Sequence, residues 1–176
     1  MDEAKIKERK DPTKKPARRL FINLDQWWEV KDPKVECSYP YHPDNDGFIS
    51  LREWLAFQLV CRKCEDAPCI SACRYEALER LESGEIKEIK RNNLLCVGCK
   101  SCALACPFGT IYFEIIPFLT FKCDLCEGRL KEGEKPLCVH TSPQGAIEYG
   151  DLEVEEEKNQ HLVGEVIVQM TPWKKG

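Results

Sequence analysis

Hydrophobic and polar positions follow a regular period in only a few short stretches of this chain. Residues 19–24 alternate closely enough to predict a strand, and residues 163–170 alternate in the manner of an edge strand. A capping box at Ser50-Leu51-Arg52-Glu53 predicts the start of a short helix. The apolar face of that helix is expected to consist of Leu51, Trp54, Leu55 and Leu59.

Turn residues indicate two more elements. The runs 77–81 and 86–90 flank Glu82-Ser83-Gly84, which predicts a β-hairpin. Residues 111–116 follow a turn at 107–109 and predict a further strand. The segment 111–121 is unusually apolar, and we interpret it either as core packing or as a patch that docks on a partner. Short strands and short helices together predict the α+β class.

The composition limits how much apolar core these elements can share. Of 176 residues, 43% are hydrophobic and 32% are charged, and the formal net charge is -4. An acidic chain of this kind is not expected to bind nucleic acid, and no apolar stretch approaches the roughly 18 residues of a membrane helix. Twelve cysteines without a secretory signal favour the cytoplasm, where thiols bind metal instead of pairing.

The cysteines fall into runs with the spacing of iron–sulfur ligands. The first complete run is Cys61-x2-Cys64-x4-Cys69-x3-Cys73, and the second is Cys96-x2-Cys99-x2-Cys102-x3-Cys106-Pro107. A third block, Cys123-x2-Cys126-x11-Cys138, has Ser142-Pro143 where its last cysteine is expected. Cys37 fits the end of a fourth run whose other positions hold Trp27, Val30 and Pro33.

Ligand sets follow from a rule for two-cluster ferredoxins, in which three cysteines of one run bind one cluster and the fourth binds its neighbour. The rule predicts that cluster 1 has the ligands Cys61, Cys64, Cys69 and Cys106. Cluster 2 has the ligands Cys96, Cys99, Cys102 and Cys73, and cluster 3 has Cys123, Cys126, Cys138 and Cys37. The remaining positions, Trp27, Val30, Pro33 and Ser142, hold no usual ligand. We therefore predict three [4Fe–4S] clusters that use all twelve cysteines.

Each assignment has a competitor. Zinc is the main alternative metal, because paired Cys-x2-Cys motifs also build four-cysteine zinc sites. The run that ends at Cys106-Pro107 favours a ferredoxin-type cluster instead. Cys37 competes with Ser142 as the last ligand of cluster 3, and the softer thiolate is favoured for iron. We expect Trp27 either to fill the space of the missing cluster or to be an ordinary core residue.

The runs also predict how the chain is organised. Two pseudo-symmetric bacterial-ferredoxin-like modules are expected, each made of short hairpins and short helices around clusters. Residues 61–116 form the continuous two-cluster module. The outer one-cluster module combines residues 19–60, with the degenerate run and a connecting helix, and residues 117–150. A basic extended arm, 1–18, and a tail, 151–176, complete the chain.

A cluster with four thiolate ligands has no open position for a substrate, so its expected chemistry is the transfer of single electrons. The sequence contains no dinucleotide fingerprint, phosphate loop or nucleophile–base pair. Substrate chemistry is therefore expected on another chain, with no catalytic residue on this one. A metal-stabilised binding or regulatory protein is the alternative from another class.

Several motifs resemble a known family. Cys123-Asp124-Leu125-Cys126-x2-Arg129-x3-Gly133-x2-Pro136-x-Cys138, followed by Pro143-x-Gly145-Ala146-Ile147, is similar to the last cluster motif of the electron-transfer subunits of molybdenum and tungsten oxidoreductases. Cys61-x2-Cys64-Glu65-Asp66-x-Pro68-Cys69 and Cys96-Val97-Gly98-Cys99 resemble the second and third motifs. The likeness covers residues 20–150, and it departs at Arg74, where the family usually has proline. Those subunits carry four clusters, whereas this chain keeps only Cys37 of the first run.

A three-cluster version of this subunit resembles the small iron–sulfur subunit of tungsten-dependent class II benzoyl-coenzyme A reductases of strict anaerobes. The resemblance implies a tungsten-pterin catalytic subunit as partner, in a hetero-oligomer, with further electron-carrier subunits or a ferredoxin. It also implies a role in the reductive dearomatisation of benzoyl-CoA. An aldehyde, formate or related molybdenum or tungsten oxidoreductase is the alternative enzyme.

Overall fold

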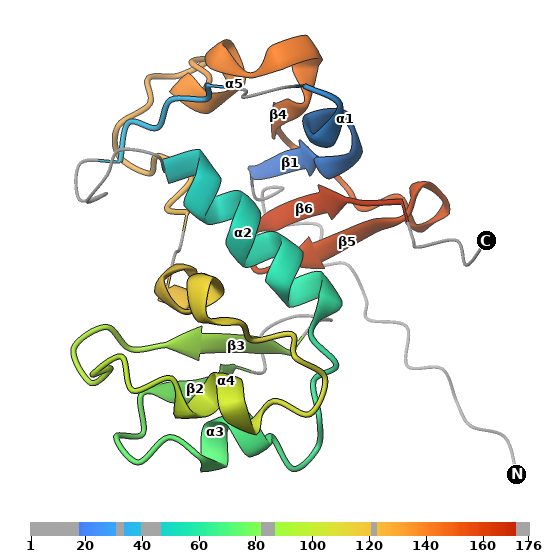
Figure 1. Ribbon diagram of the computed structural model, residues 1–176. Helices are drawn as coiled ribbons and strands as arrows, with labels where there is room; N and C mark the ends of the chain where they lie inside the picture. The colour runs from blue at the N-terminus through green and yellow to red at the C-terminus, as the bar shows by residue number, and fades with distance from the viewer. Residues whose placement is uncertain (1–17, 31–33, 40–46, 82–86, 121–122, 172–176) are drawn as a thin grey trace, which may run out of the picture.

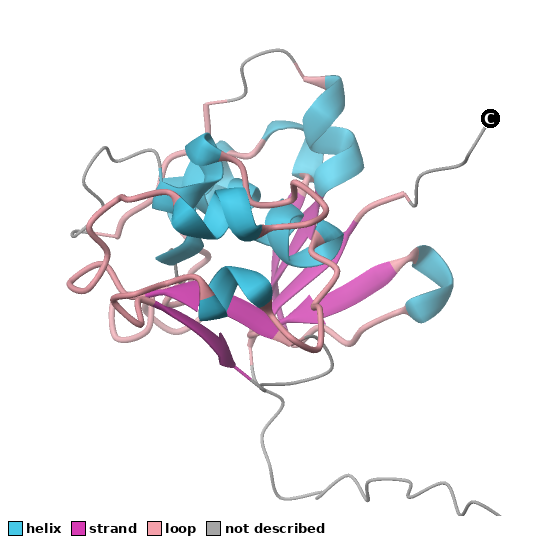
Figure 2. Cartoon of the chain, turned by 60° about the horizontal axis from the view of Figure 1, so that its bottom comes forward, coloured by secondary structure: helices cyan, strands magenta, loops and turns pink. Residues whose placement is uncertain are grey.

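A computed structural model describes residues 18–30, 34–39, 47–81, 87–120 and 123–171 of the chain. The fold is α+β, as the short periodic stretches predict. A four-stranded sheet forms one end of the molecule, a two-stranded hairpin with short helices forms the other, and a long helix lies between them (Figure 1). Figure 2 shows how much of the chain is loop between these elements.

The larger sheet has the strand order β4-β1-β6-β5. Its strands are β1 (Arg19–Asn23), β4 (Ile147–Gly150), β5 (Gln160–Val163) and β6 (Val166–Gln169). β1 pairs antiparallel with β4, with Ile22 opposite Ile147, and parallel with β6, with Ile22 opposite Val168. The predicted strand over residues 19–24 is therefore confirmed.

The residues predicted to form an edge strand, 163–170, fold differently. They contribute the end of β5, a two-residue turn and the whole of β6. β6 pairs with β1 on one side and with β5 on the other, so it is a central strand and the prediction is wrong. Its residues Val166, Ile167 and Val168 are all buried, which is typical of a strand covered on both faces. Part of the predicted tail thus belongs to the sheet.

A short helix, α1 (Leu24–Glu29), follows β1 directly. The Asn23 side chain accepts hydrogen bonds from the amides of Asp25 and Gln26, at 3.1 and 3.2 Å, and so caps the helix. The Asp25 carboxylate accepts hydrogen bonds from the amide and hydroxyl of Thr171, the latter at 2.6 Å. The chain beyond β6 is thereby fastened to the start of α1.

The long helix α2 (Gly47–Val60) contributes to two hydrophobic cores. Leu51, Trp54 and Leu55 pack in the core under the larger sheet, and Leu59 packs against that core, as predicted. Phe57 belongs to the core of the hairpin end. The helix starts three residues before Ser50, whose side chain is buried inside it, so the predicted capping box does not form the N-terminus.

The predicted hairpin is present as β2 (Leu78–Leu81) and β3 (Glu88–Arg91), paired antiparallel with Leu78 opposite Arg91. Its connection, 82–86, lies outside the described residues. The buried Gln58 side chain on α2 donates to the Ile89 carbonyl at 2.8 Å and accepts from the Ile89 amide at 3.2 Å. One amide side chain thus extends the hydrogen bonding of β3 onto the long helix.

The strand predicted over residues 111–116 is wrong, because the chain forms a 3₁₀ helix, η1 (Phe113–Thr120). The buried residues are Ile111, Ile115, Ile116 and Leu119, whose spacing suits a helical face and not a strand. Pro117 has no amide to give to a strand ladder. These four residues pack in the core, whereas Tyr112 and Phe113 are exposed, so the core interpretation holds for only part of the segment.

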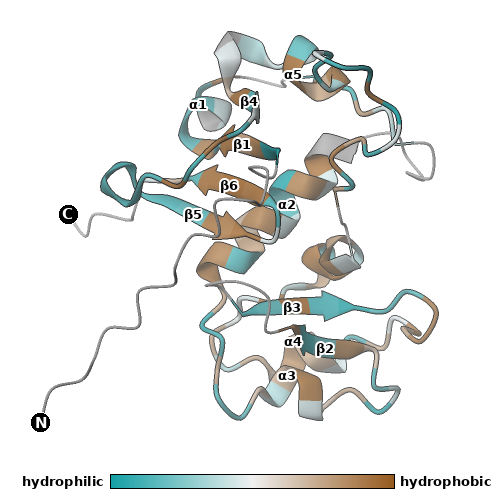
Figure 3. Ribbon diagram, turned by 180° about the vertical axis from the view of Figure 1, so that it is seen from behind, coloured by the Kyte–Doolittle hydropathy of each residue, from teal (hydrophilic) through white to brown (hydrophobic). Residues whose placement is uncertain are grey.

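The remaining elements are single turns of helix near the cysteines and in the last third of the chain. They are α3 (Pro68–Ser71), α4 (Ser101–Ala105), α5 (Leu137–Thr141), η2 (Pro143–Gly145) and η3 (Glu156–Lys158). Apolar residues are concentrated along β1 and β6, while the outer helical turns are mixed in character (Figure 3). The four-stranded sheet and the lone hairpin differ, so the pseudo-symmetry of the two modules and their boundaries stay predictions.

Candidate metal centres

The third cysteine of each run lies at the same place in the local structure. Cys69 is the second residue of α3, Cys102 is the second residue of α4, and Cys138 is the second residue of α5. The fourth position of each run, at Cys73, Cys106 and Ser142, comes just after the corresponding helix. Three local structures built alike indicate that the runs are true equivalents.

The Cys-x2-Cys loops also share a backbone feature. The residue before the second cysteine has a positive φ in all three, at Lys63 (52°), Gly98 (71°) and Leu125 (52°). This left-handed conformation costs roughly 1–2 kcal/mol for a non-glycine residue. Two of the three loops accept that cost, so a left-handed residue before the second cysteine is a feature common to all three loops.

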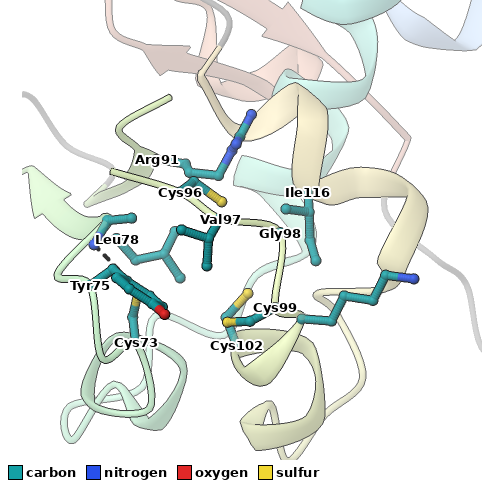
Figure 4. A pocket seen from close by; sticks show the side chains of 12 residues that line it. Cys73, Tyr75, Leu78, Arg91, Cys96, Val97, Gly98, Cys99, Cys102 and Ile116 are labelled. Atoms are coloured by element: carbon teal, nitrogen blue, oxygen red, sulfur yellow. Dashed lines mark hydrogen bonds between the residues drawn. The ribbon is translucent and has the colours of Figure 1, made fainter. Parts of the chain in front are cut away.

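All four predicted ligands of cluster 2 line one pocket. Cys73 comes from the end of the first run, whereas Cys96, Cys99 and Cys102 come from the second. Figure 4 shows their side chains around one hollow, together with Tyr75, Leu78, Val97 and Ile116. The four cysteines that the ferredoxin rule assigns to cluster 2 thus line the same pocket, and their role as ligands stays a prediction.

Three predicted ligands of cluster 1 also come together from two runs. Burial, together with the nearby Cys61 and Cys106 sulfurs, raises the pKa of the Cys69 thiol to about 11. All three pack at the apolar core of the hairpin end. Cys64 is held by its backbone, because the Arg80 guanidinium donates to the Cys64 carbonyl.

The cysteines of cluster 3 interact across the longest sequence separation. Burial, together with the nearby Cys123, Cys126 and Cys37 sulfurs, raises the pKa of the Cys138 thiol to about 12. Burial likewise raises the pKa of Cys123 to about 12. Cys37 is thus no isolated core residue, since it lies close enough to the other three sulfurs to interact with each of them electrostatically.

The three sets differ in exposure. Cys123 and Cys138 pack against the core under the sheet, whereas Cys99 is exposed. A hydrogen bond with Ser101, whose Oγ lies 3.4 Å from the Cys99 sulfur, lowers the pKa of that thiol. Burial raises the pKa of Cys102, the neighbour of Cys99 in the same pocket. Among the predicted ligands, the set of cluster 2 therefore includes an exposed cysteine, whereas the sets of clusters 1 and 3 each contain one buried and three half-buried cysteines.

Backbone amides point at several of the sulfurs. Tyr39 donates to Cys37 at 3.4 Å, Ala77 donates to Cys73 at 3.3 Å, and Leu125 donates to Cys123 at 3.4 Å. Such N–H···S bonds stabilise thiolate ligands and raise the reduction potential of a cluster. At Cys106, burial raises the thiol pKa, but hydrogen bonds from Thr110 and from backbone amides outweigh it, so the pKa is lowered.

The fourth, empty set of positions has no metal-binding character. Trp27 is buried in the core, and the Ser142 hydroxyl accepts a hydrogen bond of 3.1 Å from the Ile147 amide. Pro33 lies outside the described residues. Trp27 belongs to the core against which Cys123 and Cys138 pack.

Several residues that support the cysteine loops gave no signal in the sequence. Arg80 holds Cys64 from sixteen residues away, and the Lys63 ammonium donates to Gln58 at 2.5 Å. Arg129 forms an ion pair of 2.6 Å with Asp124, which holds the pKa of that carboxyl below its usual range. Asp124 in turn accepts a 3.0 Å hydrogen bond from the Cys126 amide. Of these residues, only Asp124 and Arg129 belong to a motif that the sequence reveals, the last cluster motif.

The donor sets suit a large sulfur-bridged group better than a single ion. All twelve cysteines are free. A zinc ion with Zn–S bonds of 2.3 Å needs sulfur atoms about 3.8 Å apart. Among the described residues, no three His, Cys, Asp or Glu side chains are arranged to hold one metal ion. Four thiol groups that line one pocket suit a [4Fe–4S] cluster, which would supply one-electron redox chemistry there.

Helix length bears on membrane insertion. Within the described ranges, even α2, with its 14 residues, is too short and too polar to span a bilayer.

Comparison with known proteins extends these observations. The uncharacterized ferredoxin-like protein YdhX of Escherichia coli K12 is 39% identical to this chain over 108 residues, which is 61% of this chain and 46% of that protein. The thiosulfate reductase electron transfer subunit PhsB of Salmonella typhi is 37% identical over 113 residues, which is 62% of this chain and 56% of that protein.

The B subunit of the anaerobic dimethyl sulfoxide reductase of Escherichia coli K12 is 32% identical over 104 residues, which is 59% of this chain and 49% of that protein. The chain thus spans about half the length of the curated relatives it matches. The profile of the 4Fe-4S dicluster domain matches residues 52–152, more than half of the chain and every cysteine except Cys37. The cysteine runs, their shared local geometry and this match show that the chain belongs to the 4Fe-4S dicluster domain family and carries [4Fe–4S] clusters.

Proposed function

We propose that this chain is an electron-transfer subunit, which passes single electrons to or from the pterin-bound metal of a separate catalytic subunit. The observation that carries the proposal is the pocket lined by Cys73, Cys96, Cys99 and Cys102, four thiol ligands drawn from two runs. Four thiolates close the coordination of a [4Fe–4S] cluster, so such a site moves electrons and does not bind substrate.

The proposed cofactor content is three clusters with the ligand sets predicted from the spacing. The electrostatic contact of Cys37 with Cys123, Cys126 and Cys138 supports the third set. The Ser142 hydroxyl already accepts a hydrogen bond from the Ile147 amide, and this supports Cys37 over Ser142 as the last ligand. In this proposal the chain's residues hold the clusters, donate hydrogen bonds to their sulfurs and shield cluster 3 from water.

The names of the relatives support a role as one subunit among several. One relative is named as an electron transfer subunit of thiosulfate reductase, and another as one of the chains of an anaerobic dimethyl sulfoxide reductase. We infer from them a catalytic partner of the molybdenum or tungsten class. Because the chain spans about half the length of these relatives, the substrate of its catalytic partner does not follow from their names.

For the partner we propose a tungsten-pterin subunit of class II benzoyl-CoA reductase, in the cytoplasm of an anaerobe. This more specific proposal is supported by the number of complete ligand sets, because this chain has three and the electron-transfer subunits that it resembles carry four clusters. An aldehyde, formate or related oxidoreductase is the alternative, and the named relatives favour an enzyme of that wider class.

Metal analysis of anaerobically purified full-length protein tests the proposed relay. About twelve iron and twelve sulfide per chain correspond to three complete clusters. About eight iron contradicts the third set, and zinc without sulfide contradicts electron transfer altogether. Reduction of the clusters by reduced methyl viologen, followed by electron paramagnetic resonance, shows whether they are redox-active.

Co-purification from the native source tests the partner. A tungsten-pterin chain and viologen-linked activity with benzoyl-CoA are the expected results. Molybdenum, or activity with thiosulfate, an aldehyde or formate in place of benzoyl-CoA, would assign the chain to another enzyme while leaving the electron-transfer role intact.

A further inference from the structure

An ion pair lies beside one predicted ligand of cluster 3. The guanidinium of Arg129 contacts both oxygens of the Asp124 carboxylate, at 2.6 and 3.0 Å. One of these oxygens, Oδ1, also accepts a 3.0 Å hydrogen bond from the amide of Cys126. The amide of Arg129 in turn donates to the Cys126 carbonyl at 3.0 Å. Both residues of the ion pair are therefore hydrogen-bonded to the backbone of this cysteine.

The guanidinium also interacts with sulfur atoms of the ligand set. Hydrogen bonding with Asp124, and to a smaller extent with the Cys126 sulfur, raises the pKa of Arg129 above its usual range. The Arg129 Cζ atom lies 5.8 Å from the centre of the Tyr39 ring, and the Tyr39 amide donates to the Cys37 sulfur at 3.4 Å. Arginine stays protonated in proteins, so a fixed positive charge lies near two ligands of cluster 3.

The two charges of the ion pair act on these sulfurs in opposite directions. Burial is the main reason why the pKa of the Cys37 thiol is raised, and Asp124 raises it as well, whereas Arg129 lowers it. Burial is also the main reason why the pKa of Cys123 is raised to about 12, and Asp124 acts in the same direction. A charge that lowers the pKa of a thiol stabilises negative charge on its sulfur. Reduction adds one negative charge to a cluster, so that same charge raises its reduction potential.

A hydroxyl group reaches the Cys126 sulfur from a distant part of the chain. The Ser38 Oγ atom lies 3.4 Å from the Cys126 sulfur, although 88 residues separate the two. A thiolate that binds iron has no proton, so the hydroxyl is the donor when the cluster is bound. Similar contacts occur in the other two ligand sets, between Ser101 and Cys99 at 3.4 Å and between Thr110 and Cys106 at 3.3 Å. A hydroxyl therefore does not set cluster 3 apart from clusters 1 and 2.

We propose that Arg129 raises the reduction potential of cluster 3 and that Asp124 lowers it, so that the ion pair sets the potential at which this cluster takes up an electron. This inference rests on the ligand set of cluster 3 in the proposed function. The step itself is the transfer of one electron from a reduced neighbouring [4Fe–4S] cluster, and no bond forms or breaks.

The size of the effect follows from exposure. The side chains of Arg129 and Asp124 are 32% and 34% exposed, so water screens their charges in part. Burial around Cys123 and Cys138 makes additional negative charge on the sulfurs costly. The Arg129 cation offsets some of that cost, and without it cluster 3 should be harder to reduce.

The test is a potentiometric titration of the full-length holoprotein, followed by electron paramagnetic resonance at each potential. One redox transition should be missing in Cys37→Ala, and this identifies the transition of cluster 3. Arg129→Gln removes the cation, whereas Arg129→Lys keeps the charge and loses the two-pronged contact. Asp124→Asn removes the carboxylate charge and keeps nearly the same shape.

Two exposed residues of the same segment provide matched controls. Lys131→Gln removes a cation two residues after Arg129, and Glu127→Gln removes a carboxylate directly after Cys126. Each control changes the net charge by the same amount as its test variant. Solvent and salt screen these exposed charges, so a general effect of net charge can be separated from the effect of the ion pair.

We expect Arg129→Gln to lower the equilibrium constant for reduction of cluster 3 about tenfold, which is about 59 mV for one electron. Arg129→Lys should recover part of this loss, and Asp124→Asn should raise the constant severalfold. Lys131→Gln and Glu127→Gln should stay within about twofold of the parent protein. The transitions of clusters 1 and 2 should not move, and iron should remain at about twelve per chain in these five variants.

Three outcomes would overturn the inference. They are a potential of cluster 3 that does not move in Arg129→Gln or Asp124→Asn, shifts of the same sign in these two variants, and equally large shifts in the two controls. If Arg129→Gln does not retain cluster 3, Asp124→Asn decides, because a potential that stays or falls there contradicts the inference by itself. A failure of the proposed relay looks different, since the parent protein would then hold less than twelve iron or its clusters would accept no electrons.

Discussion

The amide of Ile147 donates a 3.1 Å hydrogen bond to the hydroxyl of Ser142, five residues before it. In the first run, the amide of Ala77 donates in a similar way to the sulfur of Cys73, which holds the equivalent position. β2 and β4 each begin five residues after these positions. Ser142 therefore keeps the local geometry of a fourth cysteine, with its oxygen engaged by the protein backbone.

That relationship predicts opposite outcomes for two single substitutions. Ser142→Ala should keep the full iron content and lose about 1 kcal/mol of stability, the typical contribution of one hydrogen bond. Cys37→Ala should lose one cluster, so that iron falls from about twelve to about eight per chain. Iron and sulfide analysis with electron paramagnetic resonance checks both. Loss of a cluster in Ser142→Ala, with none in Cys37→Ala, would reverse the assignment.

Trp27 is buried in the core against which Cys123 and Cys138 pack. Truncation to alanine should lower the free energy of unfolding by about 3–5 kcal/mol, as expected for an aromatic residue with 1% exposure. Trp27→Phe, which retains most of the volume, should cost much less. Chemical denaturation of the holoprotein measures both variants. An alanine variant of full stability would show that the indole fills no essential space.

Gln58 links the long helix to the hairpin through both atoms of its amide group. Gln58→Leu keeps the size but leaves the amide and carbonyl of Ile89 without these partners, which should cost about 2–3 kcal/mol. Gln169→Leu is the control, because the Gln169 side chain accepts a longer hydrogen bond of 3.4 Å from Gln160. Thermal unfolding of both variants gives the comparison, and equal melting temperatures would contradict the proposed link.

Removal of the clusters should destabilise the two ends of the molecule unequally. The four-stranded sheet has an apolar core that includes Ile22, Ile147 and Val168, whereas the loops of residues 61–73 and 96–106 depend on metal–ligand bonds. After anaerobic chelation with an oxidant, amide hydrogen exchange should increase in these loops more than in β1 and β6. Equal loss of protection in the sheet and the loops would show that the fold depends on the clusters as a whole.

Gly98 has a positive φ that the loop between Cys96 and Cys99 requires. A Cβ at Gly98 meets no atom within 4 Å, so Gly98→Ala should cost roughly 1–2 kcal/mol through backbone conformation alone. Gly150→Ala, also free of close contacts and without a positive φ, is the matched control. Stability measurements on both holoproteins check this, and identical values would contradict the backbone argument.

The sequence predicts best where the chemistry is local. Ligand spacing predicted that Cys73 joins the second run, and Cys73 does line one pocket with Cys96, Cys99 and Cys102, because a cluster constrains a few residues on each loop. The edge-strand prediction failed because Gly164 and Glu165 divide that stretch into a tight turn between two strands. A glycine between two apolar pairs was an available signal for this hairpin. The 3₁₀ helix η1 was missed because its apolar residues were read with the period of a strand.

Contacts between distant residues had no such local signal. Gln58 and Ile89 are 31 residues apart, and Asp25 and Thr171 are 146 apart, yet each pair joins two elements. The neighbouring residues in the sequence do not distinguish these polar residues from the many other charged and polar residues of the chain. Their partners are fixed only when the elements pack.

The position of α2 has a consequence for how fast electrons could move. One rigid helix supplies Leu55 to the core beside Cys123 and Cys138, and Phe57 to the core beside Cys61 and Cys69. Electron tunnelling slows exponentially as the gap between two redox centres widens. Because α2 contributes to both cores, it should hold predicted clusters 1 and 3 at a fixed separation. A substitution that weakens the packing of α2 would then change the tunnelling rate while leaving each ligand set intact.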